Sequence, residues 1–328
     1  MDKDLLVGID LGGTKVAAGV VDHRGQILAK AARDTQPERG PAAVVATINE
    51  ATEAVLSQVK DGYSRLAGVG IGVPGLADVD SGVVLFAPNL RWDNVPVAAM
   101  LRQHREVPVY VDNDANAAAL GEQWAGAARG VKDMILLTLG TGVGSGLIFE
   151  GRIYQGAAGY AGEVGHITMD ENGPLCGCGR RGCLETYASA TAVIRQAREA
   201  IESGRETSIK ALAEASPKGL EARTVFMAAA QGDALAQGIV DNLVRYLGLA
   251  VANLVNILNP EMVVIGGGVA AAGEQLLGPL RREVHQRALP GPAQSVAIIG
   301  AQLGNDAGII GAASLVLRGR SPKFHVNV

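Results

Sequence analysis

Cysteine and aromatic residues are scarce in this chain of 328 residues, which holds three cysteines and is 4% aromatic. An excess of one charge is also missing, because 29 Lys and Arg oppose 33 Asp and Glu to give a net charge of −4. Nucleic-acid binders carry a basic surface, so we expect no nucleic-acid partner. No apolar run reaches the roughly 18 residues that span a membrane, and the first residues lack the pattern of a signal peptide. These absences predict a cytoplasmic protein with no membrane partner.

Glycine, by contrast, is abundant, with 44 residues gathered mainly at the ends of expected strands. Strand and helix signals alternate along the chain, which predicts an α/β fold. The longest helix is expected at 234–258, whereas 156–190 has little regular pattern and the tail 319–328 is expected to be peripheral. The expected strands lie within residues 5–10, 15–22, 26–35, 66–75, 107–114, 134–154, 260–266 and 296–300.

Two glycine-rich stretches of the chain resemble each other at a distance of 128 positions. "IDLGGTKVAAGVV" overlays "LTLGTGVGSGLIF", so that Gly12 falls on Gly140 and Leu11 on Leu139. Each copy is typical of a strand, a Gly/Thr-rich turn and a second strand. Any two glycine-rich hairpins look somewhat alike, but each of these would open one domain. We therefore expect duplicated α/β domains that clamp a polyphosphate between them.

All three cysteines lie within eight residues, ten positions after a histidine. An odd number of cysteines, two of them only two positions apart, argues against a disulfide framework. One histidine and three thiolates make a closed tetrahedral set, the usual form of a structural zinc site. The alternative is three free thiols in a glycine-rich loop. The predicted zinc ligands are His166, Cys176, Cys178 and Cys183.

Three glycine turns offer backbone N–H groups to phosphate oxygens: "DLGGTK" (10–15), "LGTGVGSG" (139–146) and "IGGGV" (265–269). The spacings of a Walker loop and of a dinucleotide fingerprint are both absent. Asp10 could hold Mg²⁺ through water, and Thr14 and Lys15 could reach phosphate.

The stretch "VDNDAN" (111–116) ends a strand and opens a helix. Asp114 there could act as a general base toward a hydroxyl that attacks a phosphoryl group, with Asn113 orienting the same hydroxyl. Alternatively, Asp112 or Asp114 could simply cap the helix, a common role for Asp at such a boundary. The residues alone favour neither interpretation.

Two acidic residues flank the predicted zinc site, Glu163 and Glu185. If one ring nitrogen of His166 binds zinc, the other needs a partner, which could be a ligand hydroxyl. We therefore expect the metal to hold a substrate-recognition loop. Because all four positions go to protein, no water site remains for catalysis by the metal.

Eight motifs follow one another along the chain: "GIDLGGTKVAAGVVD", "GIGVPG", "NDANAAALGE", "LGTGVGSGLI", "GYAGEVGHITM", "CGCGRRGCLETYASA", "NPEMVVIGGGV" and "GNDAGIIGAA". With these motifs the chain resembles the ROK family of sugar kinases and repressors, most closely its bacterial glucokinases. The resemblance implies an actin-like ATPase (ribonuclease H-like) fold with two α/β domains around a cleft. The implied domains are 1–114 with a C-terminal helix near 306–318, and 115–305. The resemblance also implies ATP with Mg²⁺ as donor, glucose as acceptor and a homodimer or homotetramer.

The resemblance also assigns site residues position by position. Asp114 matches the catalytic base, which takes the proton of the sugar 6-hydroxyl. The positions that match sugar contacts are Gly75, Asn89, Asn113, Asp114, Glu163, His166 and Glu185. The positions that match the phosphate and adenosine sites are Asp10, Gly12, Gly13, Thr14, Lys15, Gly140, Thr141, Gly142, Gly266, Gly267 and Gly268.

Other functions within the family remain open at this point. A sugar-sensing repressor would carry a helix-turn-helix before the first strand, which we expect to begin by residue 5. A kinase for mannose, N-acetylmannosamine, fructose or allose is an alternative, although "EVGH" and "CLE" favour glucose. A polyphosphate-using glucokinase is another, although the turn "GGGV" favours ATP.

Overall fold

The computed structural model describes residues 3–319 and builds them around three sheets. The first sheet has the strand order β3-β2-β1-β4-β8, in which β1 is antiparallel to β2 and parallel to β4. The tail 320–328 lies outside the described residues. The strands are β1 (Leu5–Leu11), β2 (Lys15–Val21), β3 (Ile27–Asp34), β4 (Leu66–Val73) and β8 (Val109–Asn113).

The second sheet repeats this arrangement in the order β11-β10-β9-β12-β13. Here β9 is antiparallel to β10 and parallel to β12, as β1 is to β2 and β4. The hairpin repeat predicted from the sequence is therefore confirmed, and with it the duplicated α/β architecture. The strands are β9 (Met134–Leu139), β10 (Val143–Phe149), β11 (Arg152–Ile153), β12 (Met262–Gly266) and β13 (Ala297–Gly300).

A third, small sheet in the order β5-β6-β7 lies beside the first and has no counterpart in the sequence analysis. Its strands are β5 (Leu76–Asp78), β6 (Val83–Ala87) and β7 (Trp92–Val95), followed by the short helix α2 (Val97–Arg102). Strands of three to five residues are too short for an alternating pattern to stand out.

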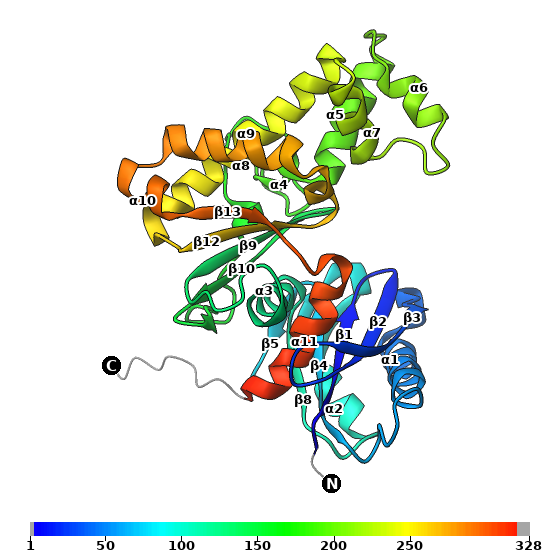
Figure 1. Ribbon diagram of the computed structural model, residues 1–328. Coiled ribbons are helices and arrows are strands. Elements are labelled where there is room, and N and C mark those ends of the chain that lie inside the picture. The colour runs from blue at the N-terminus through cyan, green and yellow to red at the C-terminus, as the bar shows by residue number, and fades with distance from the viewer. Residues whose placement is uncertain (1–2, 320–328) are drawn as a thin grey trace.

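Two helices rich in small residues lie between the large sheets, α3 (Asp114–Ala125) and α11 (Ala307–Arg318) (Figure 1). α11 packs on β1 and β4, whereas α3 contacts β9 and β10, and the two helices contact each other. The approach is close because glycine stands at the contacts. A Cβ atom at Gly8 would lie 1.8 Å from the carbonyl oxygen of Ile309, and one at Gly311 would lie 1.6 Å from that of Ala117.

Of the remaining helices, some lie on the outer face of a sheet and others pack on neighbouring helices farther out (Figure 1). α1 (Pro41–Leu56) packs on β2 and β3 of the first sheet. The helices that build the upper half are α4 (Glu185–Ala188), α5 (Ala190–Glu202), α6 (Ile209–Glu214), α7 (Ala222–Ala230), α8 (Ala234–Leu258), α9 (Glu274–Arg287) and α10 (Pro290–Ser295).

The helix α8 is long and apolar enough to cross a membrane by length and composition alone. However, 56% of its most apolar 18-residue stretch is buried inside the protein. The side chains of Leu243, Leu247 and Val251 on this helix are fully buried. Its apolar surface is thus used in the core of the upper half.

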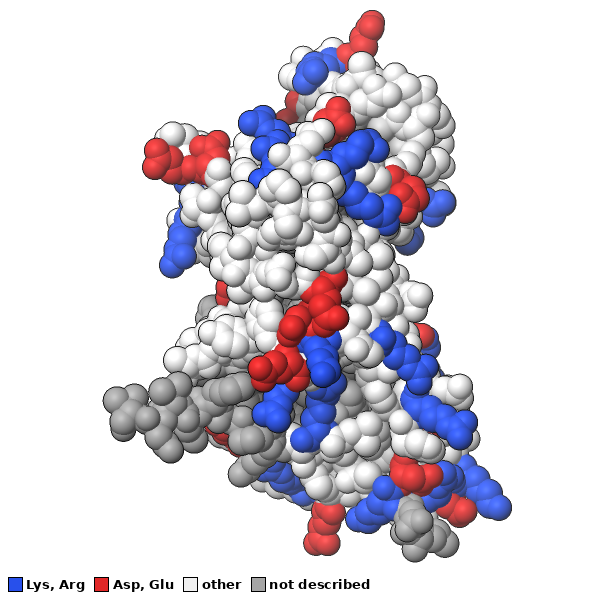
Figure 2. Space-filling view, turned by 60° about the vertical axis from the view of Figure 1, so that its left-hand side comes forward, with Lys and Arg blue, Asp and Glu red and all other residues white. Residues whose placement is uncertain are grey.

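The charges on the surface are mixed. On the face shown in Figure 2, Lys and Arg side chains are interspersed with Asp and Glu side chains over both halves of the molecule.

Candidate active site and metal centre

The turn from β8 into α3 is built by an asparagine. The side chain of Asn113 accepts hydrogen bonds from the backbone N–H groups of Ala115 (2.8 Å) and Asn116 (3.2 Å), which caps α3. Its amide nitrogen donates to the carbonyl oxygen of Gly75 at 3.0 Å. The alternative that Asp112 or Asp114 caps this helix is therefore wrong. Because Asn113 fills that role, the side chain of Asp114, the first helical residue, is not needed as the cap.

Asp114 lies where two cavities meet. It lines a large cavity of about 710 Å³, which runs between the halves of the molecule. It also lines a small cavity of about 50 Å³, walled by the loop from Gly159 to Glu163. A group at this position can reach ligands in both cavities.

The environment of Asp114 suits a proton acceptor. Burial and, to a lesser extent, the negative charges of Asp10 and Glu163 raise the pKa of its carboxyl, the hydrogen bond from Ala115 N–H lowers it, and the result is a pKa of about 6. Burial likewise raises the pKa of Asp10. A base whose pKa lies close to neutral pH is mostly ionised there and still binds a proton well.

The large cavity is lined by glycine turns from both sheets. The turn after β1 is closed by Gly12, whose N–H donates to the carbonyl of Lys15 at 2.8 Å. The turn after β12 requires glycine at position 267. The φ of Gly267 is +82°, and a Cβ atom there would lie 2.5 Å from the backbone of Leu139. Of the residues expected at a nucleotide site, those that line this cavity are Asp10, Gly12, Thr14, Lys15, Gly266 and Gly267.

The other expected nucleotide residues lie nearby but outside the cavity wall. Gly13 packs against Asn89, in the short 3-10 helix η2 (Pro88–Leu90) that follows β6. Gly268 opens a short 3-10 helix, η4 (Gly268–Ala272). The three residues Gly140, Thr141 and Gly142 form the turn between β9 and β10.

The small cavity collects four of the expected sugar residues, which are Gly75, Asn113, Asp114 and Glu163. The other three lie outside its wall. Asn89 is exposed beside Gly13. His166 belongs to a cluster with the three cysteines, and Glu185 contacts Cys176 of this cluster.

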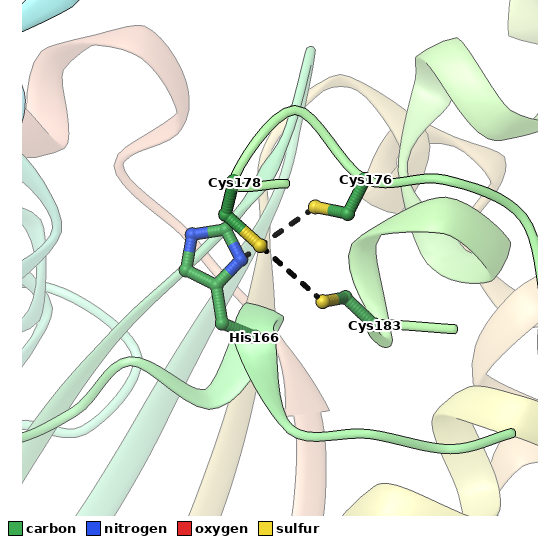
Figure 3. Close-up of side chains that lie close together, drawn as sticks. All are labelled: His166, Cys176, Cys178 and Cys183. Atoms are coloured by element: carbon green, nitrogen blue, oxygen red, sulfur yellow. Dashed lines mark hydrogen bonds between the residues drawn. The ribbon is translucent and has the colours of Figure 1, made fainter. Parts of the chain in front are cut away.

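The predicted zinc ligands converge at one point (Figure 3). The ligand atoms of His166, Cys176, Cys178 and Cys183 all lie within 4.8 Å of one another. Sγ of Cys176 lies 3.8 Å from Nδ1 of His166, and the sulfurs of Cys178 and Cys183 are 3.6 Å apart. Zn–S bonds of about 2.3 Å in a tetrahedron place sulfurs about 3.8 Å apart. The four donors therefore fit one Zn²⁺ ion.

The backbone around this cluster is held by its own hydrogen bonds. Met169 N–H donates to Gly182 O at 2.7 Å, and Cys176 N–H donates to Arg180 O at 2.8 Å. Glycine is required at 182, because its φ is +65° and a Cβ atom would lie 1.5 Å from the carbonyl oxygen of Asp170. Tyr187, just after the cluster, stacks on Tyr246 of α8 with ring centroids 3.7 Å apart.

Two carboxylates join the cluster to its surroundings, Glu163 at the small cavity and Glu185 at the turn between β9 and β10. Nε2 of His166 faces Glu163 at 4.0 Å, so the ring presents one nitrogen to the cysteines and the other toward the small cavity. Glu185 accepts a 3.0 Å hydrogen bond from the N–H of Val143, next to the turn between β9 and β10.

The structure also brings in residues that sequence reasoning missed. Ser145 on β10 lines the small cavity, donates to Gly162 O and accepts from Val164 N–H at 3.3 Å. Lys30 and Asp306 form an ion pair of 2.6 Å at the wall of the large cavity. Asp306 lies within the motif "GNDAGIIGAA" and Ser145 within "LGTGVGSG", and both motifs offered a signal, whereas Lys30 stands in ordinary strand sequence.

Comparison with known proteins agrees with this geometry. The ROK family pattern matches residues 6–319. The glucokinase of Halalkalibacterium halodurans is 44% identical over 311 residues, which is 94% of each chain. The glucokinase of Thermotoga maritima is 43% identical over 317 residues, which covers 96% of this chain and 98% of that one. A ROK family glucokinase from Streptomyces griseus, solved in complex with glucose and AMPPNP, is 38% identical with a TM-score of 0.83, covering 96% of this chain and 100% of that one. The chain has the actin-like ATPase fold and belongs to the ROK family.

Proposed function

We propose that this protein is a glucokinase, which transfers the terminal phosphoryl group of ATP to the 6-hydroxyl of glucose. The observation that carries the proposal is the position of Asp114, whose side chain lines both the large and the small cavity. The names of the close relatives and the ligands of the Streptomyces griseus enzyme support both substrates.

The reaction follows from that position. Glucose bound at the mouth of the small cavity would place its 6-hydroxyl beside Asp114, and ATP in the large cavity would place its γ-phosphorus on the other side. The hydroxyl oxygen attacks phosphorus, the proton passes to Asp114, and ADP leaves. Asp10 would hold Mg²⁺ through water, and the ion would neutralise charge on the phosphates.

The sugar is held by the carboxylates around the small cavity. We assign sugar hydroxyl contacts to Glu163, to the free ring nitrogen of His166 and to Glu185, with Gly75, Asn89 and Asn113 on the opposite side. One amide hydrogen of Asn113 is used by Gly75, which leaves the other for a ligand. Hydrogen-bonded sites of this kind discriminate strongly, because a missing hydroxyl leaves a buried polar group unpaired.

ATP is held by the glycine turns of both sheets, whose backbone N–H groups suit phosphate oxygens. We assign this role to 12–15, 140–142 and 266–268. The exposed Lys15 lies at the cavity wall, where a cation stabilises the charge that develops during phosphoryl transfer.

Zinc has a structural role in this proposal. His166, Cys176, Cys178 and Cys183 would hold it, and all four positions would be filled by protein, so the ion only fixes the loop that carries the sugar ligands.

Cleft closure completes the active site. Transfer to a sugar must exclude water, because water would otherwise accept the phosphoryl group. We propose that residues 1–114 with the helix near 306–318 move as one domain against 115–305 and close on glucose. Small-angle scattering should then give a smaller radius of gyration with glucose bound.

We also propose a cytoplasmic homodimer or homotetramer. Cysteines in a metal-binding pattern are typical of proteins from a reducing compartment such as the cytoplasm. Two apolar side chains, Ile257 (76% exposed) and Leu289 (63% exposed), lie on one surface, since the N–H of Leu289 bonds the side chain of Asn256. Light scattering on the purified protein would give its mass in solution.

A panel assay tests the proposed reaction. Purified protein is given glucose, mannose, N-acetylmannosamine, fructose or allose, each with ATP or polyphosphate, and the products are identified by phosphorus NMR. Glucose 6-phosphate formed from ATP, with the highest kcat/KM of the panel, supports the proposal. A higher kcat/KM for another hexose or for polyphosphate contradicts it.

A further inference from the structure

The residue before the Asn113–Asp114 pair carries a buried carboxylate with three neutral donors around it. Asp112, at the end of β8, is 5% exposed. Its Oδ1 accepts from Asn113 N–H at 2.7 Å and from the amide of Asn116 at 2.9 Å. Both donors belong to the segment that presents Asp114, so the hydrogen bonds to this oxygen stabilise the conformation of that segment.

The other oxygen is bonded from a different part of the chain. Oδ2 of Asp112 accepts from the side-chain amide of Gln155 at 3.2 Å. Gln155 follows β11 of the second sheet, whereas Asp112 belongs to the first sheet. This hydrogen bond therefore connects the two halves of the molecule directly behind the candidate base.

Gln155 also stands at the start of the loop that walls the small cavity. Its carbonyl oxygen accepts from Ala161 N–H at 3.1 Å, which closes residues 155–161 into a ring. The loop contains glycines with positive φ at 156, 159 and 162, so little in its own backbone fixes its position. Its far end is tied to β10 by Ser145, which bonds Gly162 and Val164.

We propose that Asp112 and Gln155 are a positioning pair that sets the sugar loop 156–163 at the correct distance from Asp114. The loop is then anchored at one end by Ser145 and at the other by the strand that presents the base. Neither residue of the pair acts on the reacting atoms. Loss of their bond leaves the base in place but lets the loop drift, so the binding of sugar weakens. This inference rests on the proposed kinase function of the same site.

A reversal of the hydrogen bond tests the pair. D112N places an amide opposite the amide of Gln155, and Q155E places a carboxylate opposite that of Asp112. Each single change should raise KM for glucose about tenfold, since a lost hydrogen bond with a buried, mismatched partner costs about that much. In D112N/Q155E the amide at 112 can donate to the carboxylate at 155. KM for glucose should then return to within about threefold of wild type.

The remaining measurements separate positioning from general damage. KM for ATP should stay within about twofold of wild type in all three variants, because the large cavity is untouched. Q196E, a matched change of a half-buried glutamine on α5, should leave KM for glucose unchanged. If D112N does not fold, Q155E and Q155L carry the test, and both should raise KM for glucose while Q196E does not.

Several outcomes would overturn the pairing. One is a normal KM for glucose in the single variants. Another is a double variant whose KM for glucose rises by the product of the two single increases. The third is a Q196E variant whose KM for glucose rises as much as that of Q155E. The wild-type chain in the same assay tests the proposed function by itself. If it prefers another hexose, KM for that hexose is used, so failure of the function and failure of the pairing stay distinct.

Discussion

The carboxylate of Glu185 joins the cysteine cluster to the turn between β9 and β10. Its Oε2 accepts from Val143 N–H at 3.0 Å, and its Oε1 lies 3.7 Å from Sγ of Cys176. A Cβ atom at Gly142 would lie 2.1 Å from the same carboxylate, so turn and cluster are in direct contact. If the cluster loses its structure, the proposed sugar contacts beside it and this turn should consequently also lose their fixed positions.

Loss of zinc should therefore weaken sugar binding first. We expect about one zinc per chain by elemental analysis of the wild type, and much less in Cys178→Ser. KM for glucose should rise at least tenfold in that variant, because its recognition loop is no longer held. Leu175→Ser, a change of a 66% exposed neighbour in the same segment, is the control and should keep its zinc. A zinc-free wild type with normal activity would show that the loop is held by other means.

Glu163 should select the sugar and leave ATP unaffected. Glu163→Gln removes the charge of a carboxylate that lines the small cavity and faces His166. We expect KM for glucose to rise about tenfold or more, the loss of one charged hydrogen bond, with KM for ATP nearly constant. Glu171→Gln, at an exposed position outside both cavities, is the control. Equal increases in both KM values would point to a folding defect instead.

The pH dependence of kcat/KM for glucose should report the base in the free enzyme. Burial raises the pKa of Asp114 to about 6. The base accepts a proton only when ionised, so kcat/KM should rise as pH increases through about 6 and level off above it. Initial rates from pH 5 to 8, with ATP saturating and glucose well below its KM, give this profile. A kcat/KM that is constant across this range would be incompatible with a base of this pKa.

Glu122 should be important for stability. Its side chain is fully buried in α3 and accepts from the N–H groups of Ala127 (2.8 Å), Gln302 (3.1 Å) and Leu303 (2.8 Å). These donors lie on the two chain segments that join the sheets. Glu122→Ala leaves all three without their acceptor, which should lower the free energy of unfolding by roughly 3 kcal/mol or more. Denaturant unfolding measures this loss, and a loss below about 1 kcal/mol would contradict it.

The repeated hairpins and the convergence of His166 with the three cysteines can be predicted from the sequence because both are local patterns. A glycine turn between two apolar runs forms a hairpin in most contexts, and closely spaced cysteines with a nearby histidine have few other uses. The length of α8 follows in the same way from its continuous helical pattern, 234–258.

Contacts between distant segments could not be predicted. The capping role of Asn113, rather than an aspartate, depends on Gly75, which lies 38 positions earlier in the chain. The bond from Gln155 to Asp112 depends on how the two sheets are placed. The sheet β5–β7 escapes detection because its short strands lack a clear period.

The most direct test of the account is Asp114→Asn, assayed for transfer and for binding on the same protein. The side chain keeps nearly the same shape and can still occupy the junction of the two cavities, but it cannot accept the hydroxyl proton as a carboxylate does. We predict that kcat falls roughly 10²–10⁴-fold, the usual contribution of a general base, while calorimetry shows glucose binding within a few-fold of wild type. A variant that turns over within tenfold of wild type, with glucose bound normally, would contradict the assignment of Asp114 as the base.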